Sequence, residues 1–136
     1  MMANIDPESV TVILDTNALM VPEQFGVDIF GELLRLGYAR WLVPASVMGE
    51  LGSLTRNADK GRDKTAAKVA LGLASSCEVI GQDVSDADTA IESLALEKGA
   101  AVFTNDRALK KRLFSKGITV IYLRQSRYLE ATKKEY

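Results

Sequence analysis

Residues 10–19 read VTVILDTNAL, an uninterrupted apolar run that ends in Asp-Thr-Asn. Apolar, β-branched residues without polar alternation predict a strand that is covered on both faces, as in a parallel sheet. Residues 101–106 read AVFTND, a second apolar segment that also ends in an acid. Ligands of open α/β sheets bind beyond the carboxyl ends of the strands, so any chemistry is expected at the edge where these two segments end.

Three weaker or longer apolar segments extend this pattern along the chain. RWLV (40–43), EVI (78–80) and ITVIY (118–122) are predicted as strands. Apolar stripes with helical spacing lie between the strands, within residues 29–36, 47–54, 66–74, 91–98 and 109–116. The order β-α-β-α-α-β-α-β-α-β predicts a three-layer α/β/α sandwich with a central parallel sheet of about five strands. We expect one domain over residues 1–136, with 1–9 and 124–136 as ancillary termini.

The composition is that of an ordinary globular domain of 136 residues, with 47% hydrophobic and 26% charged residues. No apolar run approaches the roughly 20 residues that span a bilayer, and the start lacks the pattern of a signal peptide. The single cysteine, Cys77, excludes an internal disulfide and fits a reducing compartment. These features predict a cytoplasmic protein that does not contact membranes.

Two absences narrow the possible chemistry. The chain has no histidine, which excludes Ser or Cys triads with a histidine base and Zn sites built from Cys and His. It also lacks the glycine patterns of dinucleotide and P-loop sites. Catalysis must therefore come from carboxylates, lysines, hydroxyls, amides or a bound metal.

Four acids are the candidates. Asp15 follows the first strand, and Glu50, Asp88 and Asp106 fall on the apolar stripes of three helices, so they are expected to face the sheet. Each has a plainer explanation as a helix cap, a first-turn acid or an ion-pair partner, which is more common for any single position. No lysine or arginine shares their stripes. Four converging carboxylates repel unless cations are bound, which predicts two Mg²⁺ or Mn²⁺ ions and phosphodiester hydrolysis.

Taken together, these motifs resemble the PIN domain family over about residues 10–123. The resemblance rests on VILDTNAL (12–19), VMGEL (47–51), DADTAI (86–91) and FTNDRALKKRL (103–113). It places the four family acids on Asp15, Glu50, Asp88 and Asp106, and it implies a five-stranded parallel sheet, metal-dependent RNA cleavage and frequent dimers. Thr16, Asn17, Thr104 and Asn105 would orient the carboxylates.

The third acid has a competitor two residues away. Asp86 precedes the apolar stripe that Asp88 shares, so Asp86 is better explained as the cap of that helix, close to the site. The alternative, with Asp86 as the third acid, stays open at this point.

Basic residues gather in the segment RNADKGRDKTAAKVALGL (56–73). This segment resembles the equivalent helix in archaeal relatives of the eukaryotic small-subunit rRNA-processing nuclease more than that of typical toxins. Arg56, Lys60, Arg62 and Lys64 could follow an RNA backbone, or they could form a solvated helix face. Arg107 and the basic residues after it have the same two interpretations.

The main functional hypothesis is a metal-dependent endoribonuclease acting in rRNA processing. The alternatives are a toxin-type PIN ribonuclease of a toxin–antitoxin pair and a non-catalytic PIN module that binds RNA or protein. A phosphatase or receiver-like domain with Asp15 as nucleophile is disfavoured, because D-T-N lacks the second aspartate of the common phosphatase motif. Expected partners are RNA, a second copy of the chain, and an antitoxin or a ribosome-assembly factor.

Overall fold

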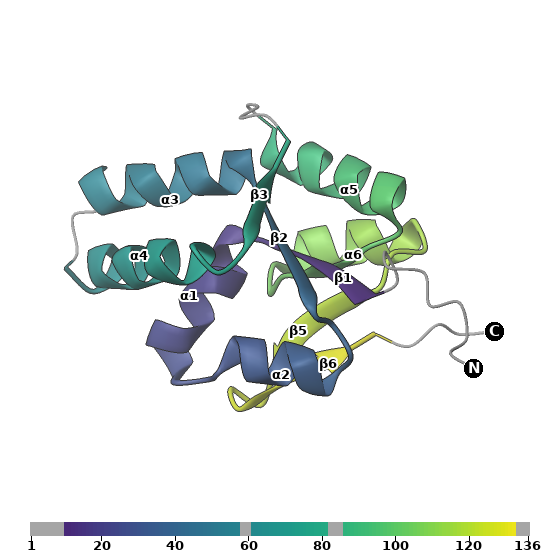
Figure 1. Ribbon diagram of the computed structural model, residues 1–136, viewed down its shortest axis with the longest axis horizontal. Helices are drawn as coiled ribbons and strands as arrows, with labels where there is room; N and C mark the ends of the chain where they lie inside the picture. The colour runs from purple at the N-terminus through teal and green to yellow at the C-terminus, as the bar shows by residue number, and fades with distance from the viewer. Residues whose placement is uncertain (1–9, 58–60, 82–85, 133–136) are drawn as a thin grey trace.

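A six-stranded sheet in the order β3-β2-β1-β4-β5-β6 runs through the molecule (Figure 1). The computed structural model describes residues 10–57, 61–81 and 86–132, except for the side chains of residues 62 and 63. Neighbouring strands from β3 to β5 are parallel, and β6 pairs antiparallel with β5. The strands are β1 (Thr11–Leu14), β2 (Arg40–Pro44), β3 (Glu78–Ile80), β4 (Ala101–Phe103), β5 (Val120–Arg124) and β6 (Tyr128–Ala131).

Helices cover both faces of the sheet. They are α1 (Thr16–Phe25), α2 (Ile29–Arg35), α3 (Ala45–Asn57), α4 (Gly61–Ala74), α5 (Ala87–Lys98) and α6 (Arg107–Ser115). The chain steps from β1 through β2 to β3 in one direction, then crosses back to β4 and continues to β5. Right-handed crossovers therefore place α1 to α4 on one side of the sheet and α5 and α6 on the other. No helix in the described part of the chain is long and apolar enough to span a membrane.

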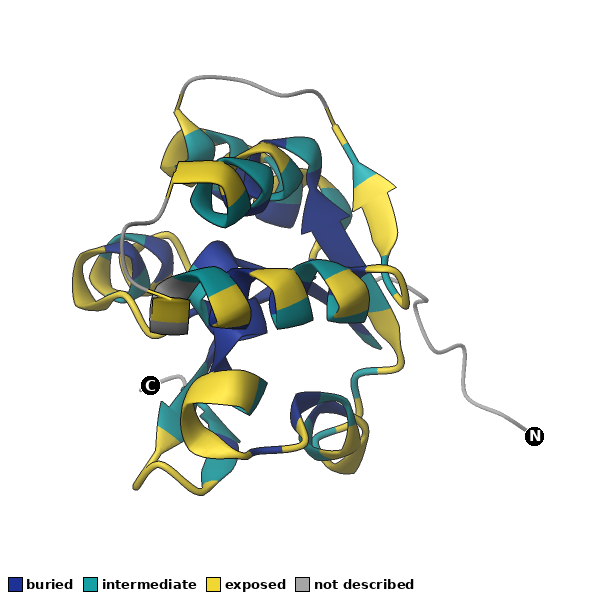
Figure 2. Cartoon of the chain, turned by 90° about the vertical axis from the view of Figure 1, so that its left-hand side faces the viewer, coloured by how far each residue is buried: buried dark blue, intermediate teal, exposed yellow. Residues whose placement is uncertain are grey.

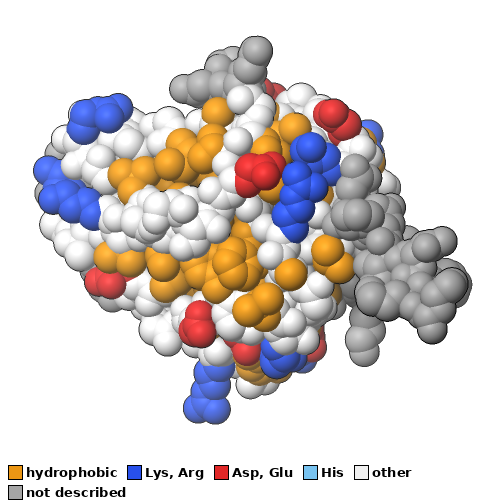
Figure 3. Space-filling view, in the orientation of Figure 1, with side chains coloured by type: hydrophobic (Ala, Val, Ile, Leu, Met, Phe, Trp, Pro, Cys, Tyr) orange, Lys and Arg blue, Asp and Glu red, His pale blue; other side chains and the backbone are white. Residues whose placement is uncertain are grey.

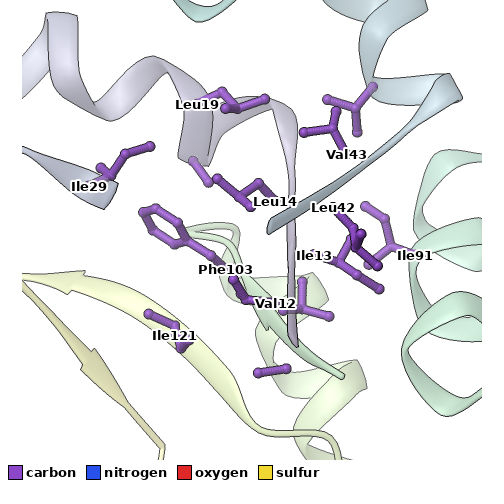
Figure 4. Close-up of a cluster of buried hydrophobic side chains, with 14 of the residues drawn as sticks. Val12, Ile13, Leu14, Leu19, Ile29, Leu42, Val43, Ile91, Phe103 and Ile121 are labelled. Atoms are coloured by element: carbon purple, nitrogen blue, oxygen red, sulfur yellow. The ribbon is translucent and has the colours of Figure 1, made fainter. Parts of the chain in front are cut away.

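The core lies on the two central strands. Every residue of β1 and β4 is buried, and the side chains of Ile13, Leu14 and Phe103 pack with those of Leu42 and Ile121 (Figure 4). Figure 2 shows buried residues along the strands and on the inner sides of the helices. Burying each such side chain contributes roughly 2 kcal/mol. This rigid centre fixes the positions of the residues that follow β1 and β4.

Aspartate begins four of the helices. Asp15, Asp28, Asp86 and Asp106 occupy the N-cap positions of α1, α2, α5 and α6, and each side chain accepts a hydrogen bond from a backbone N–H of the first turn. Such a cap typically stabilises a helix by about 1 kcal/mol. Capping alone therefore does not distinguish a structural aspartate from a functional one in this chain.

Two elements were not predicted from the sequence. Helix α1 follows β1 directly and contains Pro22, a residue that normally ends or kinks a helix interior. Strand β6 lies within residues 124–136, which were expected to be an ancillary terminus, and its Leu129 is fully buried. The segments 1–9 and 133–136 lie outside the described residues.

Side chains of α2 bind the backbone of β6. The Leu129 N–H donates to Glu32 Oε1 at 2.9 Å, and the Arg35 guanidinium donates to the Leu129 carbonyl at 2.7 Å. Glu32 and Arg35 also form an ion pair at 2.9 Å. These side chains replace the hydrogen bonds that a seventh strand would make to the edge of the sheet.

Candidate active site

The candidate site lies at the carboxyl edge of the sheet, between β1 and β4. The chain leaves these neighbouring strands toward helices on opposite faces, and ligands of open α/β sheets bind at the carboxyl ends of such a strand pair. Asp15 follows β1 immediately, and its N–H donates to the carbonyl of Phe103, the last residue of β4. The sequence prediction that the two acidic strand ends meet at one edge is confirmed.

Asp15 is held in one orientation by three donors. Its Oδ1 accepts from the Thr16 backbone N–H at 2.7 Å, and its Oδ2 accepts from the Thr104 hydroxyl at 2.8 Å. The Asn17 amide donates to Oδ2 at 3.2 Å. Only 9% of Asp15 is exposed, so these bonds form in a largely water-free environment. Charge-assisted hydrogen bonds of this kind fix the carboxylate before any ligand binds.

Thr104 connects Asp15 with Asp106. The Thr104 hydroxyl donates to Asp15 and accepts from the Asp106 backbone N–H at 3.1 Å. Asp106 Oδ1 in turn accepts from the Leu109 N–H at 2.9 Å, which starts α6 at this point. One buried hydroxyl therefore sets the spacing of two candidate acids.

The two asparagines tie the loops after β1 and β4 together. Asn17 Oδ1 accepts from the Asn105 N–H at 3.0 Å, and Asn105 Oδ1 accepts from the Leu123 N–H of β5 at 2.8 Å. With Thr16 and Thr104, these residues surround Asp15 on the side of β4. The structure thus brings together the four residues that the sequence predicted to orient the carboxylates.

Glu50 and Asp88 reach this edge from α3 and α5, but both are exposed. The prediction that they face the sheet on buried stripes is wrong. In α3 the buried stripe is narrow, and it includes Val47 and Leu51 but not the intervening Glu50. Asp88 belongs to the first turn of α5, before the stripe begins at Ile91.

Asp106 is exposed as well, so its predicted inward orientation is also wrong. As the cap of α6 it precedes the helix, and the helical stripe of Leu109 and Leu113 does not extend back to it. Its Oδ1 is used by the cap, and no described residue bonds its second carboxylate oxygen. Solvent can therefore reach that oxygen.

The carboxylates nonetheless act on one another electrostatically. Burial raises the pKa of Asp15, the hydrogen bonds from Thr104 and Thr16 partly oppose this, and the charges of Asp88 and Glu50 raise the pKa further. The pKa of Asp88 is raised first by partial burial and then by the charges of Asp106 and Asp86. All four predicted acids thus contribute to one negative field.

Arg112 adds a positive charge that the sequence did not place near the acids. Its guanidinium bonds Glu92 Oε1 at 2.9 Å and the Thr89 hydroxyl at 3.0 Å, which joins α6 to α5. Its charge lowers the pKa of Asp88 against the raising effects. The sequence carried no signal for this contact, because it depends on how α5 packs beside α6.

Asp86 and Asp88 have different surroundings. Asp86 accepts from the Thr89 N–H at 3.2 Å and from the Thr89 hydroxyl at 2.6 Å, and these bonds lower its pKa. The Asp88 carboxylate accepts no hydrogen bond from any described residue. Asp86 is therefore engaged as a helix cap, while Asp88 is available to a ligand.

The donor chemistry of this edge fits a hard divalent cation. The four acids offer only carboxylate oxygens, which Mg²⁺ and Mn²⁺ prefer, and repulsion among them favours cation binding. Among the described residues, however, no three Asp, Glu or Cys side chains lie close enough to form a ready coordination shell. The ligand types fit, whereas Glu50 and Asp88 would have to move inward to reach a cation shared with Asp15.

The predicted RNA-binding residues fall in two places. Arg107 is exposed and directly follows Asp106, so it lies beside the acids. Arg56 and Lys64 lie near the end of the α3–α4 pair that projects away from the sheet, where Figure 3 shows basic side chains at the left of the molecule. Arg56 lies six positions after Glu50, about 9 Å along α3. Lys60 and the side chain of Arg62 lie outside the described residues.

Comparison with known proteins gives consistent relatives. The chain is 35% identical over 115 residues to Ribonuclease VapC9 of Archaeoglobus fulgidus, covering 85% of this chain and 84% of that protein. It is 28% identical over 123 residues to Ribonuclease VapC4 of Methanocaldococcus jannaschii, covering 88% and 94% of the two chains.

Solved structures share the fold. The structure of the PIN domain endonuclease Utp24 superposes with a TM-score of 0.71 at 25% identity, covering 91% of this chain and 92% of that one. VapBC2 from Rickettsia felis, bound to a DNA fragment from its promoter, gives a TM-score of 0.55 at 16% identity over 82% of this chain and 98% of that one, a likeness of fold alone. A family model described as "PIN like domain" matches residues 12–126. The chain belongs to the PIN domain family.

Proposed function

We propose that this protein is a divalent-metal-dependent ribonuclease that hydrolyses RNA phosphodiester bonds at the carboxyl edge of its sheet. The observation that carries the proposal is the Asp15–Thr104–Asp106 arrangement, with Glu50 and Asp88 in the same negative field. Two relatives that match most of the chain are named ribonucleases, which supports the same activity here.

The surroundings of each acid indicate its role in the proposed reaction. Asp15 and Asp106, joined through Thr104, hold carboxylate oxygens at fixed positions at the carboxyl ends of β1 and β4. Glu50 and Asp88 approach from the other side and can change rotamer, because no described residue bonds their carboxylates. Mg²⁺ or Mn²⁺, bound by these four acids, would supply Lewis acidity at the phosphate and would lower the pKa of a bound water below that of bulk water. Arg107, which is exposed and directly follows Asp106, would neutralise a neighbouring phosphate.

For the biological role, we favour a toxin-type ribonuclease over an rRNA-processing enzyme. The curated relatives are VapC ribonucleases, and one similar structure is a VapBC2 complex. A partner of the VapB kind is then expected for this chain. The similarity to the Utp24 endonuclease structure supports rRNA processing as the second candidate.

Cleavage of labelled single-stranded RNA tests the proposed activity. The purified protein should cleave in Mn²⁺ or Mg²⁺ and stop when EDTA is added, and Asp15→Asn should be inactive under the same conditions. An Asp86→Asn variant is the matched control, because asparagine keeps the cap of α5 while removing one charge. Cleavage that persists in EDTA, or equally in Asp15→Asn, would refute the proposed site.

Expression of the chain in cells separates the two roles. A toxin-type ribonuclease should arrest growth, and co-expression of a short reading frame adjacent to its gene should relieve the arrest. Accumulation of uncut rRNA precursors on depletion, without growth arrest on expression, would favour rRNA processing instead.

A further inference from the structure

A basic groove lies between α6 and the β5–β6 hairpin, outside the acid cluster. Its volume is about 910 Å³, and its lining includes Arg107, Lys110, Lys111, Phe114, Tyr122 and Thr132. Arg107 stands next to Asp106 at the start of α6, so one end of the groove adjoins the candidate active site. The other end follows α6 toward Ser115, about 13 Å away for a helix of this length.

Positive charge is concentrated along this groove. Residues 107–116 contain five basic residues and no acid, and three of the five, Arg107, Lys110 and Lys111, line the groove, whereas the whole chain has a net charge of −1. Arg107 and Lys111 form no ion pair with any described residue. Of the basic residues in the helix, Arg112 alone is paired with an acid in the described part, and it faces α5 rather than the groove. The unpaired cations favour a polyanionic ligand.

Aromatic side chains accompany the cations. Phe114 is 43% exposed although it is a large apolar residue, and it lines the groove. The Tyr122 ring is held by a hydrogen bond from its hydroxyl to Glu130 at 2.7 Å, and the Lys110 ammonium lies 3.6 Å from the ring centre. Cations beside an exposed aromatic ring, here that of Phe114, are the combination that binds single-stranded nucleic acids, through phosphate contacts and base stacking.

We infer that this groove binds the single-stranded RNA segment that flanks the scissile phosphate, with Lys110 and Lys111 contacting phosphates and Phe114 stacking on a base. The inference rests on the proposed function for the identity of the ligand. The inference adds the path of the RNA: from the four acids the strand runs along α6, and not along the α3–α4 pair.

RNA binding in EDTA tests the groove without cleavage. The probe is a fluorescent single-stranded oligoribonucleotide, and the measurement is its dissociation constant over a range of salt concentrations. Lys110→Ala/Lys111→Ala should bind more weakly, with the slope of log K against log salt reduced by about 0.7 for each lost phosphate contact. Phe114→Ala should lose about 5- to 150-fold in affinity with little change in the slope. Lys111→Ala alone serves if the double variant loses stability.

The matched control is Lys68→Ala/Lys98→Ala, which removes two positive charges on α4 and α5 and leaves the groove intact. If the groove variants bind RNA as tightly as this control does, the inference is overturned. The same result is expected if the groove binds an acidic peptide instead of RNA. A wild-type protein that binds through the groove but never cleaves would refute the ribonuclease proposal and leave the groove standing.

Discussion

The two sides of the candidate active site are built differently. On the side of β1 and β4, Asp15 accepts three hydrogen bonds and Asp106 is tied to it through Thr104. On the side of α3 and α5, Glu50 and Asp88 are exposed and accept no hydrogen bond from any described residue. One side is fixed before a ligand arrives, and the other can still adjust.

This difference suggests how the site would bind cations. A fixed carboxylate costs little further entropy on binding, while mobile ones can close around an ion of the right size. Burial is the main cause that raises the pKa of Asp15 on the fixed side, and partial burial is also the first cause for Asp88 on the other side. Variants on the two sides should therefore fail in different ways.

Asp15→Asn should have the largest effect, with a loss of cleavage of more than about 100-fold, beyond that typical of residues around a metal ligand. The metal-free protein should be at least as stable as the wild type, because the buried charge is removed and the Thr104 hydroxyl can turn toward Asn17 Oδ1, 3.5 Å away. Thermal melting with and without Mn²⁺ measures this: saturating metal at 100 times its Kd stabilises by about 2.7 kcal/mol. A destabilised metal-free variant would indicate that Asp15 is mainly structural.

Asp88→Ala and Asp86→Ala should separate the two neighbouring acids of α5. Asp88→Ala should reduce cleavage on the order of 100-fold, as expected for a metal ligand, without loss of metal-free stability. Asp86→Ala should cost about 1 kcal/mol of unfolding free energy through the lost cap, with cleavage nearly unchanged. Urea unfolding and initial cleavage rates give both quantities. The reverse pattern would make Asp86 the third acid.

Thr104→Val tests the link within the fixed side. Removing the hydroxyl should lower kcat about 10- to 100-fold by releasing Asp15 and Asp106 from their relative positions. It should also cost about 1–3 kcal/mol of stability, because the buried Asp15 carboxylate loses a donor. Thr104→Ser, which keeps the hydroxyl, should have most of the wild-type kcat and most of the wild-type stability. Wild-type kcat and stability in Thr104→Val would show that the hydroxyl does not hold the two acids in position.

The pH dependence of stability should be a smaller effect. The raised pKa of Asp88 means that the folded protein holds this proton more tightly than the unfolded chain does. The contribution of Asp88 to the free energy of unfolding is complete below the ordinary aspartate pKa of 3.8. It is lost as the pH rises through the raised pKa that Asp88 has in the folded protein. In EDTA, the melting temperature of the wild type should therefore fall relative to that of Asp88→Asn as the pH rises through this window. A difference between the two proteins that stays constant with pH would show that burial and the neighbouring charges do not raise the pKa of Asp88.

Arg56→Ala/Lys64→Ala should have the smallest effect on the site, because both residues lie toward the far end of the α3–α4 pair. RNA affinity should change less than in the groove variants at every salt concentration. A larger change would move the RNA path to this pair and weaken the groove inference.

The sequence predicted best the site residues that directly follow a strand, because the strand itself fixes their positions. The positions of Asp15 and Thr104 follow from two apolar strands ending at one edge, and the structure confirms them. The exposure of Glu50, Asp88 and Asp106 was not predictable from helical spacing, because a three-residue step can lie at the border of a buried stripe. The contacts of Arg112 and the pairing of β6 depend on tertiary packing, so the sequence did not predict them. The four aspartate caps have similar sequence surroundings, so the sequence alone does not separate the functional ones from the structural ones.

The pairing of Glu32 and Arg35 with Leu129 has a practical consequence for shortened forms of the chain. Ending the protein at residue 124, where the sequence suggests a dispensable tail, would remove β6 and leave β5 as a bare edge. Its unpaired backbone would then invite strand exchange between molecules and aggregation. The last strand belongs to any minimal domain designed from this chain.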